Sequence, residues 1–159
     1  MMPRRDVLPI RRCIAVLAAW ILGALAGPAV AGDPEFYPVP GAAGERLPFS
    51  DAVRVGNLLF LAGKLGNIPG TRRLAAGGIA GETRQTMENI KAALERHGAG
   101  LEDVVKCTVF LADIGDWEAM NEVYVSYFPG PKPARSAVGV NGLALDARTE
   151  IECVAVLGD

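Results

Sequence analysis

The sequence is poor in the residues that metal, thiol and nucleophile chemistry requires. Its 159 residues include one histidine, His97, and three cysteines, with neither a Cys-x-x-Cys pair nor a Gly-x-Ser-x-Gly motif. A zinc site needs several cysteine or histidine ligands at short spacings, and a small disulfide-stapled fold needs more cysteines than these. The sequence therefore predicts no metal site. We interpret His97 as a residue in the last turn of a helix, where a cation interacts favourably with the helix dipole.

Net charge is equally small. Lysine and arginine number 16 against 18 acidic residues, so the formal net charge is −2. The strong positive charge that is typical of nucleic-acid-binding proteins is missing. Hydrophobic residues make up 50% of the chain, which indicates one domain with a packed core and excludes a disordered chain.

The N-terminal segment has the three-part organisation of a secretory signal sequence. Four arginines within residues 4–12 precede an apolar, charge-free segment at 13–27. Pro28 follows, and an Ala-Val-Ala triplet ending at Ala31 has the spacing that signal peptidase recognises. We predict a signal peptide over residues 1–31, cleaved after Ala31.

Two alternatives for this segment stay open. The charge-free stretch reaches Gly32, close to the roughly 20 residues that span a bilayer, so it also fits a permanent N-terminal anchor. The arginine pairs Arg4-Arg5 and Arg11-Arg12 leave the choice between general secretion and twin-arginine export undecided.

Cleavage would place the remaining chain in the periplasm or outside the cell, without a membrane span. That chain has 12 basic and 17 acidic residues, a net charge near −5, which argues against nucleic acid as a partner. Cys107 and Cys153 would remain, in an oxidising compartment. They would either form a disulfide or stay buried as free thiols within strands.

Local patterns at the start of the mature chain predict a leader and a hairpin. Residues 32–46 contain three prolines and are typical of an extended leader. Two short apolar segments, 52–55 and 58–62, flank Gly56-Asn57. Because these two residues tolerate positive φ, the pattern predicts a β-hairpin. The region from 63 to 78 is predicted to be mostly loop.

Helix and strand patterns alternate through the rest of the chain. Apolar residues recur at helical spacing from Glu82 to His97, and Gly98 is placed to be the left-handed C-terminal cap. A second helix is predicted to begin at Asp116, as its capping residue, and to end near Phe128. Strands are predicted at 104–111, 134–140 and 147–157. The order ββ-(loop)-α-β-α-ββ predicts an α+β fold, a mixed sheet with two helices on one face.

The last two predicted strands carry charged residues on defined faces. Arg135 shares its face with the small residues Ala137 and Gly139, while Glu150 and Glu152 share a face of the other strand. A guanidinium beside small side chains is a candidate carboxylate receptor. The alternative is a cross-strand salt bridge from Arg135 to Glu150 or Glu152, worth about 0–1 kcal/mol if exposed.

Six segments in a fixed order together resemble a known family. They are Pro48-Phe49-Ser50 with Val55-Gly56-Asn57-Leu58, then 84–91, 105–111, 120–124, Pro133-Ala134-Arg135-Ser136, and Glu150-Ile151-Glu152. On these segments, residues 47–159 resemble the RidA/YjgF family of reactive-intermediate (enamine/imine) deaminases.

The resemblance implies a chorismate-mutase-like protomer that assembles as a homotrimer, with its sites between neighbouring subunits. It implies that Arg135 binds the substrate carboxylate, that Glu150 handles the hydrolytic water, and that Gly63 and Asn121 belong to the substrate-binding site. The implied reaction is hydrolysis of 2-imino and 2-enamino acids, of the 2-iminobutanoate and 2-iminopropanoate type, to 2-keto acids and ammonia. No metal or organic cofactor is implied.

Three positions depart from the family pattern. Phe49 stands where tyrosine is common, Ala62 where serine is common, and Ala137 where cysteine is common. We still place Phe49 and Ala137 among the substrate-binding positions, in a site that is less polar than usual. The replacements imply either a bulkier, more apolar substrate or reduced activity.

Two other functions stay open alongside the enzyme. One is a non-catalytic trimer that uses Arg135 to bind small carboxylates. The other is a holdase-like protein that acts through exposed apolar surface.

Overall fold

The computed structural model describes residues 32–40 and 47–158. The predicted signal peptide (1–31) and the end of the leader (41–46) lie outside the described residues. In the part that is described, no helix is long and apolar enough to cross a membrane.

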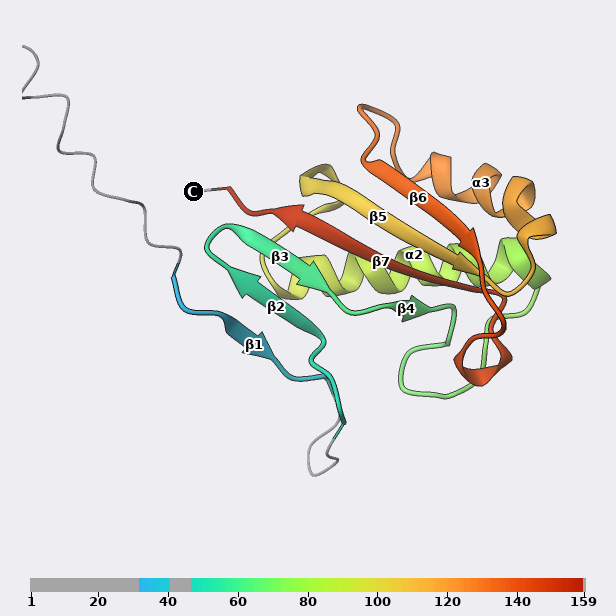
Figure 1. The fold of residues 1–159 in the computed structure, drawn as a ribbon, viewed down its shortest axis with the longest axis horizontal. Coiled ribbons are helices and arrows are strands. Elements are labelled where there is room, and N and C mark those ends of the chain that lie inside the picture. Colours follow the sequence, from blue (N-terminus) through green and yellow to red (C-terminus); the bar gives the residue numbers. More distant parts are fainter. Residues whose placement is uncertain (1–31, 41–46, 159) are drawn as a thin grey trace, which may run out of the picture. The chain divides into compact units, whose positions relative to one another are not determined.

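Strands of the described chain form a single mixed sheet (Figure 1). Its strands are β1 (Glu35–Tyr37), β2 (Ala52–Val55), β3 (Leu58–Leu61), β4 (Lys64–Leu65), β5 (Val104–Leu111), β6 (Ala134–Gly139) and β7 (Thr149–Val156). They follow the order β1-β2-β3-β7-β5-β6, and the short β4 also pairs with β7. The predicted α+β class is confirmed, while β1 and β4 are two short strands within segments predicted as leader and loop.

The predicted hairpin is confirmed. β2 and β3 pair antiparallel around Gly56-Asn57, and Gly56 has a φ of 59°. Side chains of β3 alternate, with Leu59 and Leu61 buried and Leu58 and Phe60 exposed. This alternation gives the sheet one face that packs against the helices and one open face.

β5 lies between the last two strands. It pairs parallel with β6 and antiparallel with β7, so β6 and β7 are not neighbours as the sequence analysis assumed. The parallel pair is connected through the helix α3 (Trp117–Ser126), because parallel strands need a crossover connection. This arrangement separates the two strands that carry the candidate charged residues.

Helix α2 (Gly78–Arg96) begins four residues before the predicted Glu82. The additional turn contains Gly78 and Gly81, whose low helix propensity conceals the true start in the sequence. At the other end the predicted cap is confirmed. Gly98 has a φ of 78°, and the Ala99 amide donates to the Leu94 carbonyl at 2.9 Å, as in a Schellman motif.

Helix α3 follows a short 3₁₀ turn at Ile114–Asp116. Asp116 holds the N-cap position, but its side chain makes no capping hydrogen bond. Its carboxylate instead accepts hydrogen bonds from Arg148, at 3.0 Å from Nε and 3.1 Å from an Nη atom. The prediction of Asp116 as a side-chain cap was therefore wrong, because a guanidinium outcompetes the helix amides for the carboxylate.

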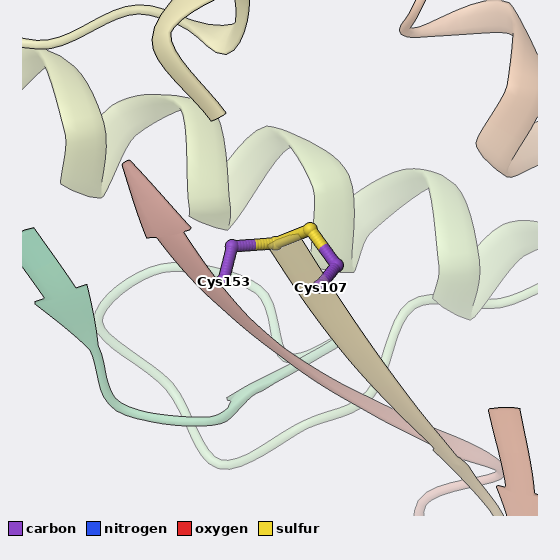
Figure 2. The surroundings of a disulfide bond; sticks show 2 residues. All are labelled: Cys107 and Cys153. Atoms are coloured by element: carbon purple, nitrogen blue, oxygen red, sulfur yellow. A yellow bond between two sulfur atoms is a disulfide. The ribbon is translucent and has the colours of Figure 1, made fainter. Parts of the chain in front are cut away.

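A disulfide joins Cys107 of β5 to Cys153 of β7 (Figure 2). The two residues are direct partners in the strand register. Both are buried in the core between the sheet and the helices. Of the two alternatives that the sequence left open, the structure shows the disulfide.

Candidate functional site

Glu150 lies on the open face of the sheet, at the start of β7. Its neighbours Thr149 and Ile151 are fully buried on the helix side, whereas Glu150 is half-buried. β4 pairs with this part of β7, with Leu65 opposite Glu150. Gly63 immediately precedes β4, and a Cβ atom placed on Gly63 would overlap the Glu150 carboxylate. The predicted site residues Gly63 and Glu150 are therefore in close contact, and only glycine permits the approach.

The surroundings of Glu150 shift its pKa upward. Burial raises the pKa of Glu150, and the negative charge of Glu152 on the same face of the strand raises it further. A carboxyl group with a raised pKa accepts and returns a proton more readily near neutral pH than an ordinary one does. Its environment thus suits Glu150 to proton transfer.

Phe49 and Ala62 line a hollow of about 400 Å³. Phe49 is 57% exposed. Ala62 directly precedes Gly63, and its amide donates to the Asp51 carbonyl at 3.0 Å. The predicted positions Phe49 and Gly63, together with Ala62 and Glu150, therefore form one group, the Glu150 half-site.

Arg135 lies on the helix side of β6. Its guanidinium carbon is 4.7 Å from the ring centre of Tyr124 and 5.7 Å from that of Trp117, both on α3. Within residues 32–40 and 47–158, no carboxylate lies within salt-bridge distance of Arg135. The aromatic rings thus hold the guanidinium while leaving its N–H donors free of an ionic partner.

Asn121 and Ala137 belong to the same region. Asn121 lies four residues after Trp117 and three before Tyr124 on α3, so the three share one helix face. Ala137 follows Arg135 by two residues and packs against the core. We call Arg135, Asn121, Ala137, Tyr124 and Trp117 the Arg135 half-site.

Tyr124 was not predicted as part of the site. Its ring is 4% exposed, and its hydroxyl has no hydrogen-bond partner among the described residues. Burial raises the pKa of Tyr124 to about 12, against the opposing effect of the positive charge on Arg135. The sequence shows Tyr124 only as an apolar-face residue of a helix, and its position beneath Arg135 depends on the crossover connection.

The two half-sites lie on opposite faces of the sheet. Arg135 is in register with Cys107, which faces the helices, whereas Glu150 is in register with Phe110 on the open face. The alternative prediction of a salt bridge from Arg135 to Glu150 or Glu152 is therefore wrong, because β5 separates the strands and the side chains point to opposite sides. A single chain does not bring Arg135 and Glu150 together.

Asp51 is a buried carboxylate that the sequence analysis missed. It is 3% exposed. Lys64 Nζ lies at 2.5 Å, Arg96 at 3.0 Å and His97 Nε2 at 3.2 Å from its oxygens. Burial alone raises the pKa of Asp51, but hydrogen bonds from Lys64, Arg96 and His97 outweigh it, so the pKa lies below its ordinary value.

This network ties the end of α2 to the Glu150 half-site, because Asp51 lies two residues after Phe49 and Lys64 directly follows Gly63. His97 also stacks on Tyr37, with ring centres 4.4 Å apart. The interpretation of His97 as a cation for the helix dipole therefore omitted its two main partners, Asp51 and Tyr37. Within the described ranges there is no cluster of three His, Cys, Asp or Glu side chains that could hold a metal ion.

Comparisons with known proteins agree with this architecture. Residues 41–157 match the family model described as Endoribonuclease L-PSP. A RutC family protein of Pyrococcus horikoshii is 49% identical over 108 residues, which cover 68% of this chain and 86% of the relative. The human 2-iminobutanoate/2-iminopropanoate deaminase is 41% identical over 119 residues, covering 75% and 85% of the two chains.

Solved structures show the same fold. The crystal structure of Escherichia coli TdcF with bound serine superposes with a TM-score of 0.67 at 33% identity, over 71% of this chain and 91% of that one. With a family model that covers most of the described residues, the chain belongs to the RidA/YjgF family, whose model carries the name Endoribonuclease L-PSP. Its relatives include proteins named as deaminases of reactive imines.

Proposed function

We propose that the protein hydrolyses 2-imino and 2-enamino acids to 2-keto acids and ammonia, at a site that two copies of the chain build together. The observation that carries the proposal is that the two half-sites offer different chemical groups. One offers a carboxylate suited to proton transfer. The other, on the opposite face of the same sheet, offers a guanidinium that has no ionic partner among the described residues.

Apolar surface supports the association of several copies. Large apolar side chains are exposed on the sheet: Leu58 and Val138 are 36% and 43% exposed. Exposed apolar patches of this kind mark interaction sites. The proposed homotrimer is a closed ring that repeats a single interface. At each interface the Arg135 half-site of one copy meets the Glu150 half-site of the next.

The chemistry follows from the two groups. Arg135 donates hydrogen bonds to the substrate carboxylate and fixes its orientation. Glu150 accepts a proton from water while the water oxygen bonds to the imine carbon, and this proton is passed to the nitrogen. The hydroxyl proton is then transferred through Glu150 to the nitrogen as the C=O bond forms, the C–N bond breaks, and ammonia leaves. A 2-enamino acid first takes a proton on carbon and loses one from nitrogen, which converts it to the imine.

Named relatives support the substrate class. The human relative is named for 2-iminobutanoate and 2-iminopropanoate, and TdcF was crystallised with serine, which shares with these imines a carboxylate beside the nitrogen-bearing carbon. The net charge near −5 of residues 32–159 disfavours RNA as the substrate, in spite of the name of the family model.

We also propose that the protein works outside the cytoplasm. The N-terminal segment has the order of regions of a signal peptide. The disulfide between Cys107 and Cys153 is the form that cysteines take in oxidising compartments.

The test uses imines generated by an amino-acid oxidase, with semicarbazide competing for them, so that hydrolysis lowers semicarbazone formation. Arg135→Ala and Glu150→Gln are each expected to lose about 10²-fold or more in rate. Glu152→Gln, on the same strand face, is the matched control and keeps most of the rate.

Co-refolding the two inactive variants then tests the shared site. Mixed assemblies contain some interfaces with both native residues, so activity is expected to return. If the mixture stays as inactive as its components while the wild type recovers after the same treatment, the site is not shared between copies. Full activity of Arg135→Ala alone would remove the role assigned to Arg135. A wild type that hydrolyses no imine would leave the carboxylate-binding or holdase function.

A further inference from the structure

Aromatic side chains are scarce in this protein, yet three of its five phenylalanines line one hollow. The chain contains Phe36, Phe49, Phe60, Phe110 and Phe128. The hollow of about 400 Å³ is lined by Phe36, Pro48, Phe49, Ser50, Ala52, Val53, Phe60, Leu61 and Ala62. Among the residues that the structure describes, none that lines the hollow is charged.

Strand pairing places the hollow on the open face of the sheet. Phe36 is in register with Val53, and Val53 with Phe60, so the three side chains form a row across β1, β2 and β3. Phe60 is in turn in register with Val154 of β7. Because side chains alternate along a strand, Val154 shares its face with Glu150. The hollow and the Glu150 carboxylate therefore lie on the same side of the sheet.

The chain leads directly from the hollow to the proposed reacting centre. Ala62 lines the hollow, and the next residue, Gly63, abuts the Glu150 carboxylate. A substrate whose imine carbon lies near Glu150 has its side chain within reach of Phe49 and Ala62. Since neither of these residues carries a hydroxyl, they offer a polar side chain no partner.

We propose that this hollow binds the side chain of the substrate and selects 2-imino acids with aromatic or large branched apolar side chains. The proposal rests on the proposed function and names its substrate class. An apolar cavity of about 150 Å³ holds a benzene molecule, so the hollow has room for a benzyl group. Amino acids of the phenylalanine and leucine type supply such imines when an oxidase or dehydrogenase removes hydrogen from the amine.

The experiment compares imines made from alanine, leucine and phenylalanine by an L-amino-acid oxidase, with semicarbazide as the competing trap. The wild-type kcat/KM is expected to be about tenfold or more higher for the phenylalanine imine than for the alanine imine, because each methylene in an apolar pocket contributes roughly 10-fold or more. Phe36→Ala is expected to reduce this ratio strongly. Phe36 is 66% exposed on an edge strand, so the substitution leaves the fold intact.

Val125→Ala is the matched control, because Val125 is a 39% exposed apolar residue on α3 and does not line the hollow. It is expected to leave the ratio unchanged. A wild-type ratio that favours the alanine imine, or a ratio that Phe36→Ala does not change, would overturn the pocket while the proposed function stands.

Calorimetric binding of phenylpyruvate and pyruvate separates the two proposals. If no imine is hydrolysed, the proposed function fails, and the pocket is then judged by binding alone. Tighter binding of phenylpyruvate that Phe36→Ala weakens would support the hollow as an aromatic side-chain site. Equal binding of the two keto acids by the wild type would overturn it.

Discussion

The two half-sites hold their charged residues by different physical means. Glu150 is placed by backbone pairing, with β4 alongside and a glycine against its carboxylate. Arg135 is placed by two aromatic rings of a neighbouring helix. In the proposed reaction the first arrangement controls a proton, which needs a half-buried and sterically restricted carboxylate. The second is proposed to bind a carboxylate, which needs only a directed guanidinium whose donors stay available.

The Cys107–Cys153 disulfide links β5 and β7, two neighbouring strands in the middle of the sheet. Cys107 is in register with Arg135, and Cys153 lies three residues after Glu150. The disulfide, which Figure 2 shows, therefore joins β5 to β7. β5 is the neighbour of the strand that carries Arg135, and β7 carries Glu150. Substitutions that remove the disulfide, alter the Glu150 half-site or remove a nearby charge test how far the two half-sites depend on one another.

The largest expected effect comes from breaking this link. The cysteines are 46 residues apart, and closing a loop of that length stabilises a fold by about 4 kcal/mol through the entropy of the unfolded chain. The Cys107→Ala/Cys153→Ala variant is expected to lose about this much free energy of unfolding in urea titrations. The reduced wild type serves as the control and should unfold with the variant. Equal stability of the oxidised wild type and the variant would show that the disulfide contributes nothing.

Gly63→Ala tests the Glu150 half-site alone. The new Cβ atom overlaps the end of the Glu150 side chain, which is flexible and can turn away, so the fold should persist. Displacement of a reacting group by about 1 Å costs about 10²-fold in rate, and kcat is expected to fall by this amount. Affinity for a 2-keto acid bound by Arg135 should change little.

Gly130→Ala is the matched control for this change, because no atom lies within 4 Å of a Cβ placed there. A Gly63→Ala enzyme with the wild-type kcat would show that the close contact with Glu150 has no part in catalysis.

The smallest effect is expected from Glu152→Gln, read from the pH profile. The proposed mechanism needs ionised Glu150, so kcat/KM is expected to fall as the pH drops through the pKa of Glu150, which burial and the charge of Glu152 raise above its ordinary value. Removing the Glu152 charge is expected to move this acidic limb to lower pH. The exposed Glu102 offers a control, because Glu102→Gln should leave the limb in place. A limb that stays at the wild-type pH in Glu152→Gln would assign the titration to another group.

The same raised pKa has a consequence for stability. Because folded Glu150 binds its proton more tightly than the unfolded chain does, its contribution to stability is present below the unfolded pKa and is lost as the pH rises through the folded pKa. The contribution of Asp51 to stability depends on pH in the opposite direction, because its pKa is lowered. Its contribution is present above the unfolded pKa and is lost as the pH falls through the folded one.

Much of the fold was predictable because its signals are local. Gly56-Asn57 marked the hairpin and Gly98 marked the end of α2, since both positions require a backbone that glycine adopts without strain. The start of α2 and the capping role of Asp116 were wrong. Glycines in the first turn concealed the start of α2. Arg148, which is distant in the sequence, binds the Asp116 carboxylate and keeps it from capping α3.

By itself, the sequence determined the α+β class, the family resemblance and the residue types of both half-sites, because these depend on local patterns and on order along the chain. Only the tertiary structure decided that β5 separates β6 from β7, that Arg135 and Glu150 lie on opposite faces, and that Cys107 and Cys153 are bonded. Strand order and the crossover through α3 are long-range properties. Each depends on which residues pack together after folding, and no neighbouring residues along the chain encode it.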